Sequence, residues 1–122
     1  MDTRQVGTQL VELCSKGRNL DAVDTLYSDD VVSVEPQAMA DMPAETTGKA
    51  GVRGKNIWFF DNHEIHSAKA VGPMVHGDRF AVAFEFDVTP KEGPQAGTRN
   101  TMNEIGVYTV VSGKVVREEF FY

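Results

Sequence analysis

The segment Arg79–Val88 alternates strongly between large apolar side chains and small or charged ones. Successive side chains of a β-strand point to opposite faces, so this spacing predicts a strand with one apolar and one polar face. The apolar face most simply forms hydrophobic core, and its end can also form the floor of an apolar ligand pocket. It comprises Phe80, Val82, Phe84, Phe86 and Val88, and the opposite face comprises Ala81, Ala83, Glu85 and Asp87.

The rest of the second half reads as further strands joined by turns. Gly72-Pro73 interrupts the first of them, Gly77-Asp78 and Ser112-Gly113 are typical of tight turns, and residues 90–97 form a longer loop. The expected strands cover residues 65–75, 79–88, 98–111 and 114–122.

The first half of the chain shows helical periodicity instead. Apolar residues recur at three- and four-residue steps, which predicts amphipathic helices. Helices followed by a run of antiparallel strands indicate an α+β fold, with three helices packed in a strongly curved, mostly antiparallel sheet. We expect helices over residues 3–16 and 20–27, a strand over 31–36, a loop over 37–48, and a third helix that is capped by Thr46 or Thr47 and runs to about Asp61.

The bulk composition excludes several classes of protein. At 122 residues the chain is expected to form one domain, residues 1–122. The net charge is −6 and the basic residues are scattered, so no basic stripe is available for nucleic acid. The single Cys14 rules out a disulfide framework and a cysteine-based zinc site. The N-terminus has no apolar run of signal-peptide length, and no run is long enough for a membrane span, so we expect a soluble cytoplasmic protein.

The order of these elements, with the segment "LYSDDVV" and the final hairpin "SGKVVREEFFY", resembles the SnoaL-like proteins of the nuclear transport factor 2-like superfamily. The resemblance covers essentially the whole chain. It implies a cone, in which a bent sheet wraps around the helices and a pocket opens at the wide end, and a homodimer formed through the outer sheet face. The family supports fold better than function, because it includes isomerases, dehydratases, epoxide hydrolases, cyclases and non-enzymes.

The related ketosteroid isomerases give one candidate catalytic residue. Their first strand ends in an acid before a proline, and "SVEP" places Glu35 at that position. The resemblance implies that Glu35 is a general base, whose pKa would rise in an apolar pocket; the alternative is an acid in solvent. The oxyanion donors of those isomerases are replaced by Leu10 and by Ile105 or Val107, so we do not expect ketosteroid isomerase activity.

The last two strands supply further candidates. Glu118, Phe120 and Tyr122 share one face, and registration on the family's hairpin turns Glu118 and Tyr122 into the cone. The alternative for Glu118 is a dimer interface or a pair with an arginine. On the preceding strand the alignment favours an inward set of Asn103, Ile105 and Val107; a bulge would reverse that and bring Glu104 inside with Met102 and Tyr108.

The stretch "HEIH" (residues 63–66) is not expected to bind a metal. Its histidines are three apart, where a zincin helix needs four, and on a strand such positions point to opposite sides. We expect at most one histidine, preferably His66, to face the pocket, where imidazole can exchange protons near neutral pH. Otherwise the histidines cap or hydrogen-bond backbone. The expected pocket residues are Trp58, His63, Val82, Phe84, Phe86 and Phe120.

Two functions therefore stay open. The first is an acid–base enzyme without cofactor or metal, acting on a small, largely apolar molecule, with Glu35 as base, His66 or Glu118 as partner and Tyr122 as hydrogen-bond donor. Isomerisation, dehydration, cyclisation and hydrolysis all fit. The second is a non-catalytic module for small-molecule binding or dimerisation. The outward residues Ala81, Ala83, Glu85 and Asp87 predict a mixed, moderately polar dimer interface.

Overall fold

A computed structural model describes residues 1–38 and 42–122. The chain forms three helices and six strands, and the expected α+β fold class is confirmed. The helices are α1 (Thr3–Ser15), α2 (Asn19–Leu26) and α3 (Lys49–Asn62). The strands are β1 (Tyr27–Val34), β2 (Glu45–Thr47), β3 (His63–His76), β4 (Arg79–Pro90), β5 (Asn100–Val111) and β6 (Lys114–Phe121).

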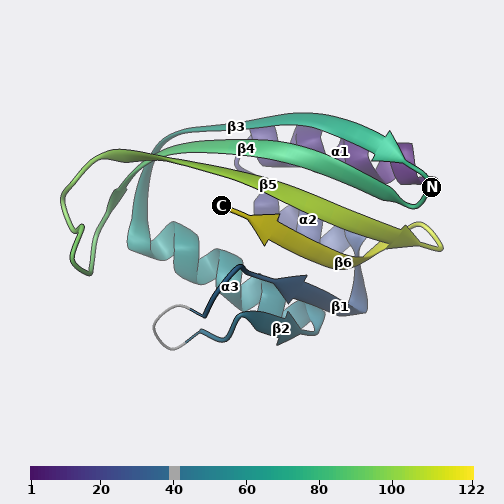
Figure 1. Ribbon diagram of the computed structural model, residues 1–122, viewed down its shortest axis with the longest axis horizontal. Coiled ribbons are helices and arrows are strands. Elements are labelled where there is room, and N and C mark those ends of the chain that lie inside the picture. The colour runs from purple at the N-terminus through teal and green to yellow at the C-terminus, as the bar shows by residue number, and fades with distance from the viewer. Residues whose placement is uncertain (39–41) are drawn as a thin grey trace.

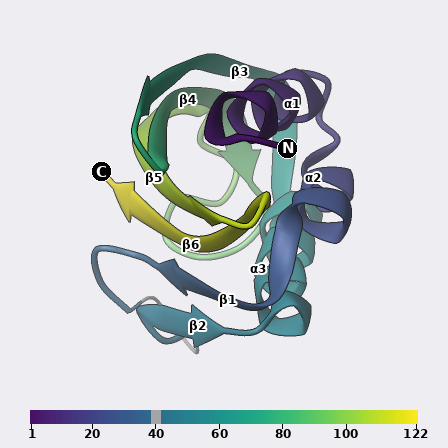
Figure 2. The same cartoon turned by 90° about the vertical axis from the view of Figure 1, so that its right-hand side faces the viewer.

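The strands form one sheet in the order β2-β1-β6-β5-β4-β3. Strands β1 and β6 run parallel, and the other neighbours run antiparallel. The sheet curls strongly, and the helices lie along its concave side (Figures 1 and 2). The result is the cone expected from the sequence.

Helix α1 forms because both its ends and its apolar stripe favour a helix. Asp2 and Gln5 make a capping box at its start, and Gly17, with a φ of 71°, follows its end. Its stripe of Val6, Leu10 and Cys14 is buried. This helix therefore covers the concave face of β3 and β4.

The apolar stripe of β4 lies in the core, as expected. Phe80, Val82, Phe84, Phe86 and Val88 are all buried, while Ala83 and Glu85 on the opposite face are exposed. Burying one such side chain contributes about 2 kcal/mol, so this stripe fixes which face of the sheet turns inward.

The region before α3 differs from the prediction. Residues Glu45–Thr47 pair with β1 as the short strand β2, so the helix is capped at Gly48 rather than at Thr46 or Thr47 and begins at Lys49. Residues 39–41 of the expected loop lie outside the described residues. Trp58 was expected to line the pocket, but it is 41% exposed and lies beside β2, in a groove with Thr46 and Thr47.

The inward set predicted for β5 is wrong. Glu104 pairs with Phe84 of β4 and Tyr108 pairs with Phe80, and paired residues of neighbouring antiparallel strands lie on the same face. Glu104 and Tyr108 therefore face the interior with the β4 stripe, whereas Ile105 is 49% exposed.

Candidate functional site

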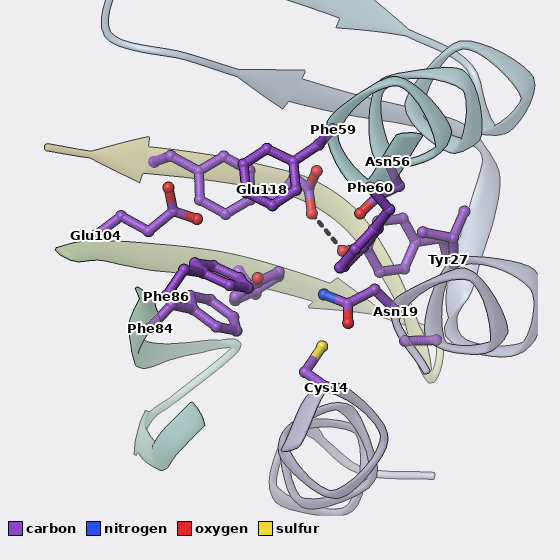
Figure 3. Close-up of a pocket in the computed structure, with 14 residues that line it drawn as sticks. Cys14, Asn19, Tyr27, Asn56, Phe59, Phe60, Phe84, Phe86, Glu104 and Glu118 are labelled. Carbon is purple, nitrogen blue, oxygen red and sulfur yellow. Dashed lines mark hydrogen bonds between the residues drawn. The ribbon is translucent and has the colours of Figure 1, made fainter. Parts of the chain in front are cut away.

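A cavity of about 100 Å³ lies between the concave face of the sheet and the three helices. Aromatic side chains make most of its wall, and two carboxyl groups, Glu104 and Glu118, face it (Figure 3). Cys14, Asn19 and Asn56 add the other polar groups. The aromatic residues are Tyr27, Phe59, Phe60, Phe84, Phe86, Tyr108 and Phe120.

Glu118, on β6, is the more buried of the two acids, with 3% of its surface exposed. Its Oε1 accepts a hydrogen bond from the Tyr27 hydroxyl (Figure 3), and its Oε2 accepts one from Ser33 Oγ at 2.6 Å. The pKa of Glu118 is raised, mainly by burial and also by the charge of Glu35, although these two hydrogen bonds and the charge of Lys55 act in the opposite direction. Glu118 is thus buried but fully hydrogen-bonded.

A network of polar side chains continues outward from Glu118. Lys55 Nζ lies 2.8 Å from Ser33 Oγ and 2.9 Å from Glu35 Oε1, and the Tyr122 hydroxyl donates to Glu35 Oε2 at 3.0 Å. A lysine ammonium can only donate, so it must donate to Ser33. The Ser33 hydroxyl proton is therefore directed at Glu118, which favours the carboxylate form of that acid.

Glu104, on β5, has a different environment. Within residues 1–38 and 42–122 it has no hydrogen bond or ion pair to another side chain. Burial raises the pKa of Glu104 to about 7, and the negative charges of Glu35 and Glu118 add to the rise, while Lys55 opposes it. This carboxyl group can therefore gain and lose a proton near neutral pH.

Cys14 lines the same cavity but is not suited to nucleophilic catalysis. Burial raises the pKa of its thiol to about 12, and the nearby charge of Glu118 adds to this. The thiolate is the nucleophilic form, so almost none is present near neutral pH.

The structure brings together part of the set expected from the sequence. Glu118, Phe84, Phe86 and Phe120 line the cavity. Glu35 and Tyr122 do not line it, and they connect to it through Lys55 and Ser33. Val82 belongs to the closed core next to it.

Neither histidine of the "HEIH" stretch lines the cavity. His66 is exposed, and its Nε2 makes a 2.7 Å hydrogen bond with Thr89 Oγ1. His63 stacks on Phe59 at 4.4 Å and donates from Nδ1 to the Phe59 carbonyl at 2.8 Å. His63 thus caps the end of α3, which is the alternative role that the sequence analysis gave for these histidines.

Sequence reasoning missed Tyr27, Ser33 and Lys55, and it kept Glu104 only in reserve. The signal for Glu104 was available, because an acid opposite the apolar β4 stripe must share its face. Lys55 could not be found this way, because its partners Ser33 and Glu35 lie in and just after β1, far from α3 in the sequence.

The described part of the chain lacks two further features, a membrane-spanning helix and a metal-binding cluster. No helix there is long and apolar enough to cross a membrane. No group of three or more His, Cys, Asp or Glu side chains is arranged there to hold a metal ion.

The cone and its cavity define a fold shared by several solved structures. A protein of Xanthomonas campestris with a cystatin-like fold is 18% identical, with a TM-score of 0.77 over 99% of this chain and 90% of that one. A protein of Catenulispora acidiphila with a ketosteroid isomerase-like fold, solved in complex with trimethylamine, is 17% identical, with a TM-score of 0.73 over 98% and 86%. These similarities establish the fold alone.

The sequence itself matches the SnoaL-like domain family over residues 1–122, and the chain belongs to that family. A protein of Mesorhizobium loti, provisionally named a SnoaL-like polyketide cyclase and also a carbohydrate phosphatase, is 41% identical over the full length of both chains, with a TM-score of 0.89. A search of curated proteins finds no match.

Proposed function

We propose that this SnoaL-like protein is an acid–base enzyme that needs no cofactor or metal and acts on a small, largely apolar molecule in the cavity. The observation that carries the proposal is Glu104, a carboxyl group in an aromatic cavity that has a pKa of about 7 and no side-chain partner among the described residues. A general acid or base works best when its pKa lies near the working pH.

The two acids take different roles in this proposal. Glu104 removes a proton from a carbon or hydroxyl group of the substrate, becomes a neutral carboxylic acid, and returns the proton to another atom. Glu118 stays hydrogen-bonded to Tyr27 and Ser33, and its negative charge adds to the rise that burial causes in the pKa of Glu104. Two carboxyl groups with different hydrogen-bonding environments in one site are a recurring arrangement for acid–base chemistry.

The proposal transfers the role first expected for Glu35 to Glu104. The Glu35 carboxylate accepts from Lys55 and from Tyr122, so both of its oxygens are engaged. His66 is exposed and bonded to Thr89, away from the cavity lining. Glu35 and Tyr122 then support the site from outside, by holding the lysine that contacts Ser33.

The test is proton exchange at carbon. Small ketones are incubated with the protein in D₂O, and deuterium incorporation next to the carbonyl is followed by NMR. We expect exchange with the wild type and a loss of at least about 100-fold in Glu104→Gln, as for removal of a general base. Glu85→Gln, which changes an exposed acid of β4, is the matched control and should keep the wild-type rate. Equal rates in Glu104→Gln and wild type would refute the role of Glu104.

A second candidate function is a binding module without turnover. It is favoured by the ion pair between Glu35 and Lys55, because the acid at the position of the isomerase base is then not free to take a proton from a substrate. Ketones that bind to the cavity but exchange no proton in the wild-type protein would support this second function over the first.

We also propose that the protein is a cytoplasmic homodimer. The outer face of β3, β4, β5 and β6 has a groove, and its exposed apolar residues include Val71, Ile105 and Phe121. Contiguous exposed apolar surface is typical of interaction sites. Light scattering at high protein concentration checks this, and a mass of one chain would contradict it.

A further inference from the structure

The charges around the cavity select its ligand. We propose that the cavity binds a compact organic ammonium ion, held by Glu104 against the aromatic wall. The interpretation of this cavity as a substrate site rests on the proposed acid–base function. The substrate is then a small amine that also carries the reacting carbonyl or hydroxyl group.

The first argument is electrostatic. In the described part of the chain, the residues that line the cavity include two acids and no Lys, Arg or His. Lys55 lies nearby, but its ammonium is bonded to Ser33 and Glu35. An anionic ligand would lie beside the two lining acids, with Lys55 already bonded to Ser33 and Glu35, whereas a cation would supply a counter-charge that the lining residues do not offer Glu104.

The second argument comes from the wall. Seven aromatic side chains line a cavity that is otherwise closed by aliphatic and amide groups. Aromatic rings attract a cation through the negative potential of their faces, and the attraction grows when the cation is removed from water. Aromatic walls together with acids are the usual composition of a site for an organic ammonium group.

The third argument is size. The volume is about 100 Å³, and a cavity of about 150 Å³ in another protein accommodates benzene. A ligand that fits inside thus has about half a dozen non-hydrogen atoms. A polycyclic polyketide is several times larger, so the cyclase name of the Mesorhizobium loti relative does not describe a molecule that this cavity can enclose.

Binding should depend on pH in a defined direction. The ionisable groups around Glu104 are Glu118 from β6, Glu35 just after β1, Lys55 from α3, and the phenols of Tyr108 on β5 and Tyr122 just after β6. Glu104 loses its charge as the pH falls through about 7. The affinity for an ammonium ion should then weaken below this pH, whereas a neutral ligand that accepts a hydrogen bond from protonated Glu104 would bind better there.

Three probes that share a tert-butyl group and differ in charge test the proposal: tert-butylammonium, tert-butanol and the slightly larger trimethylacetate. Their binding to the full chain is measured by NMR chemical shifts at pH 8. We expect tert-butylammonium to bind at least about tenfold more tightly than tert-butanol, and trimethylacetate not to bind. Equal binding of the alcohol and the ammonium, or tighter binding of trimethylacetate, would overturn the proposal.

Glu104→Gln should reduce the affinity for tert-butylammonium by about tenfold or more, and Glu85→Gln should leave it unchanged. The wild-type protein provides a second test that needs no substitution, because its affinity for tert-butylammonium should fall between pH 8 and pH 6. An affinity that stays constant over this range, or in Glu104→Gln, would place the ammonium away from Glu104 and refute the assignment.

These outcomes separate the ligand class from the enzyme function. If tert-butylammonium binds through Glu104 but no ketone exchanges protons, the proposed activity fails and the ligand class stands. If ketone exchange depends on Glu104 but the ammonium does not bind, the activity stands and the ligand class fails.

Discussion

The two acids of the cavity lie on neighbouring strands and share one aromatic enclosure, yet their surroundings differ. Glu118 accepts from Tyr27 and Ser33, and Lys55 supports Ser33 from behind. Glu104 faces the same cavity without such donors, and its pKa rises to about 7. Burial is the largest cause of a raised pKa at both carboxyl groups, and hydrogen bonds from Tyr27 and Ser33 oppose it only at Glu118.

The largest effect is expected at the centre of the polar network. Lys55→Met removes the cation from a pair whose side chains are only 11% and 16% exposed, and leaves Glu35 without its counter-charge. Breaking a buried ion pair from one side costs about 4 kcal/mol of the free energy of unfolding. Urea unfolding measures this loss. NMR titration should also show a higher pKa for Glu104, because Lys55 lowers it in the wild type.

The matched control for Lys55→Met lies on the same helix. Arg53 pairs with Asp24 at 3.0 Å, but both side chains are more than 40% exposed. Arg53→Met should change the free energy of unfolding by less than about 1 kcal/mol. Equal losses in the two variants would show that the Lys55 network is no more important than a surface ion pair.

The comparison also shows where sequence patterns were sufficient. The alternation of residues 79–88 and the capping of α1 follow local rules, so the strands, the helices and the inward stripe of β4 could be predicted. Alternation also groups Glu118 with Phe120, and the family resemblance implied that this face turns inward, where Glu118 is buried. The predictions from alternation and capping depend only on neighbours in the chain or on one strand pair.

The candidate site was predicted less well because it depends on contacts between distant elements. Glu104 was misplaced because its orientation depends on the register of β5 against β4, which has to be read across two strands. Lys55 meets Glu35 only after α3 and β1 have packed together. The "HEIH" histidines, prominent in the sequence, lie outside the cavity lining.

A second prediction concerns the unpaired acid and has a clear pH signature. The pKa of Glu104 is about 7 in the folded state against an ordinary 4.5. Between these values the folded chain holds more protons than the unfolded chain, so stability falls as the pH rises through this window. At pH 8 the penalty reaches about 3 kcal/mol.

Glu104→Gln cannot ionise and should escape this penalty. Its free energy of unfolding should match the wild type near pH 4 and exceed it by about 3 kcal/mol at pH 8, as measured by urea unfolding at several pH values. Glu85→Gln, on the exposed face of β4, should run parallel to the wild type throughout. A Glu104→Gln curve that also ran parallel would mean that Glu104 is solvated.

The smallest effect on stability is expected when Glu118 loses one of its two hydrogen bonds. This change makes the environment of Glu118 more like that of Glu104. Ser33 is fully buried, and its hydroxyl accepts from Lys55 and donates to Glu118. Ser33→Ala removes that donor and should cost about 2 kcal/mol of the free energy of unfolding. It should also raise the pKa of Glu118 further, because the hydrogen bond from Ser33 lowers it now.

NMR titration of the carboxyl carbons can follow both acids in Ser33→Ala, and exposed Ser67→Ala on β3 is the control that should leave both titrations unchanged. If Glu118 titrates as in the wild type when Ser33 is absent, then the hydrogen bond from Tyr27 and the charge of Lys55 are sufficient to hold its pKa. The difference between the two acids would then depend on the hydrogen bond from Tyr27, because the charge of Lys55 lowers the pKa of both.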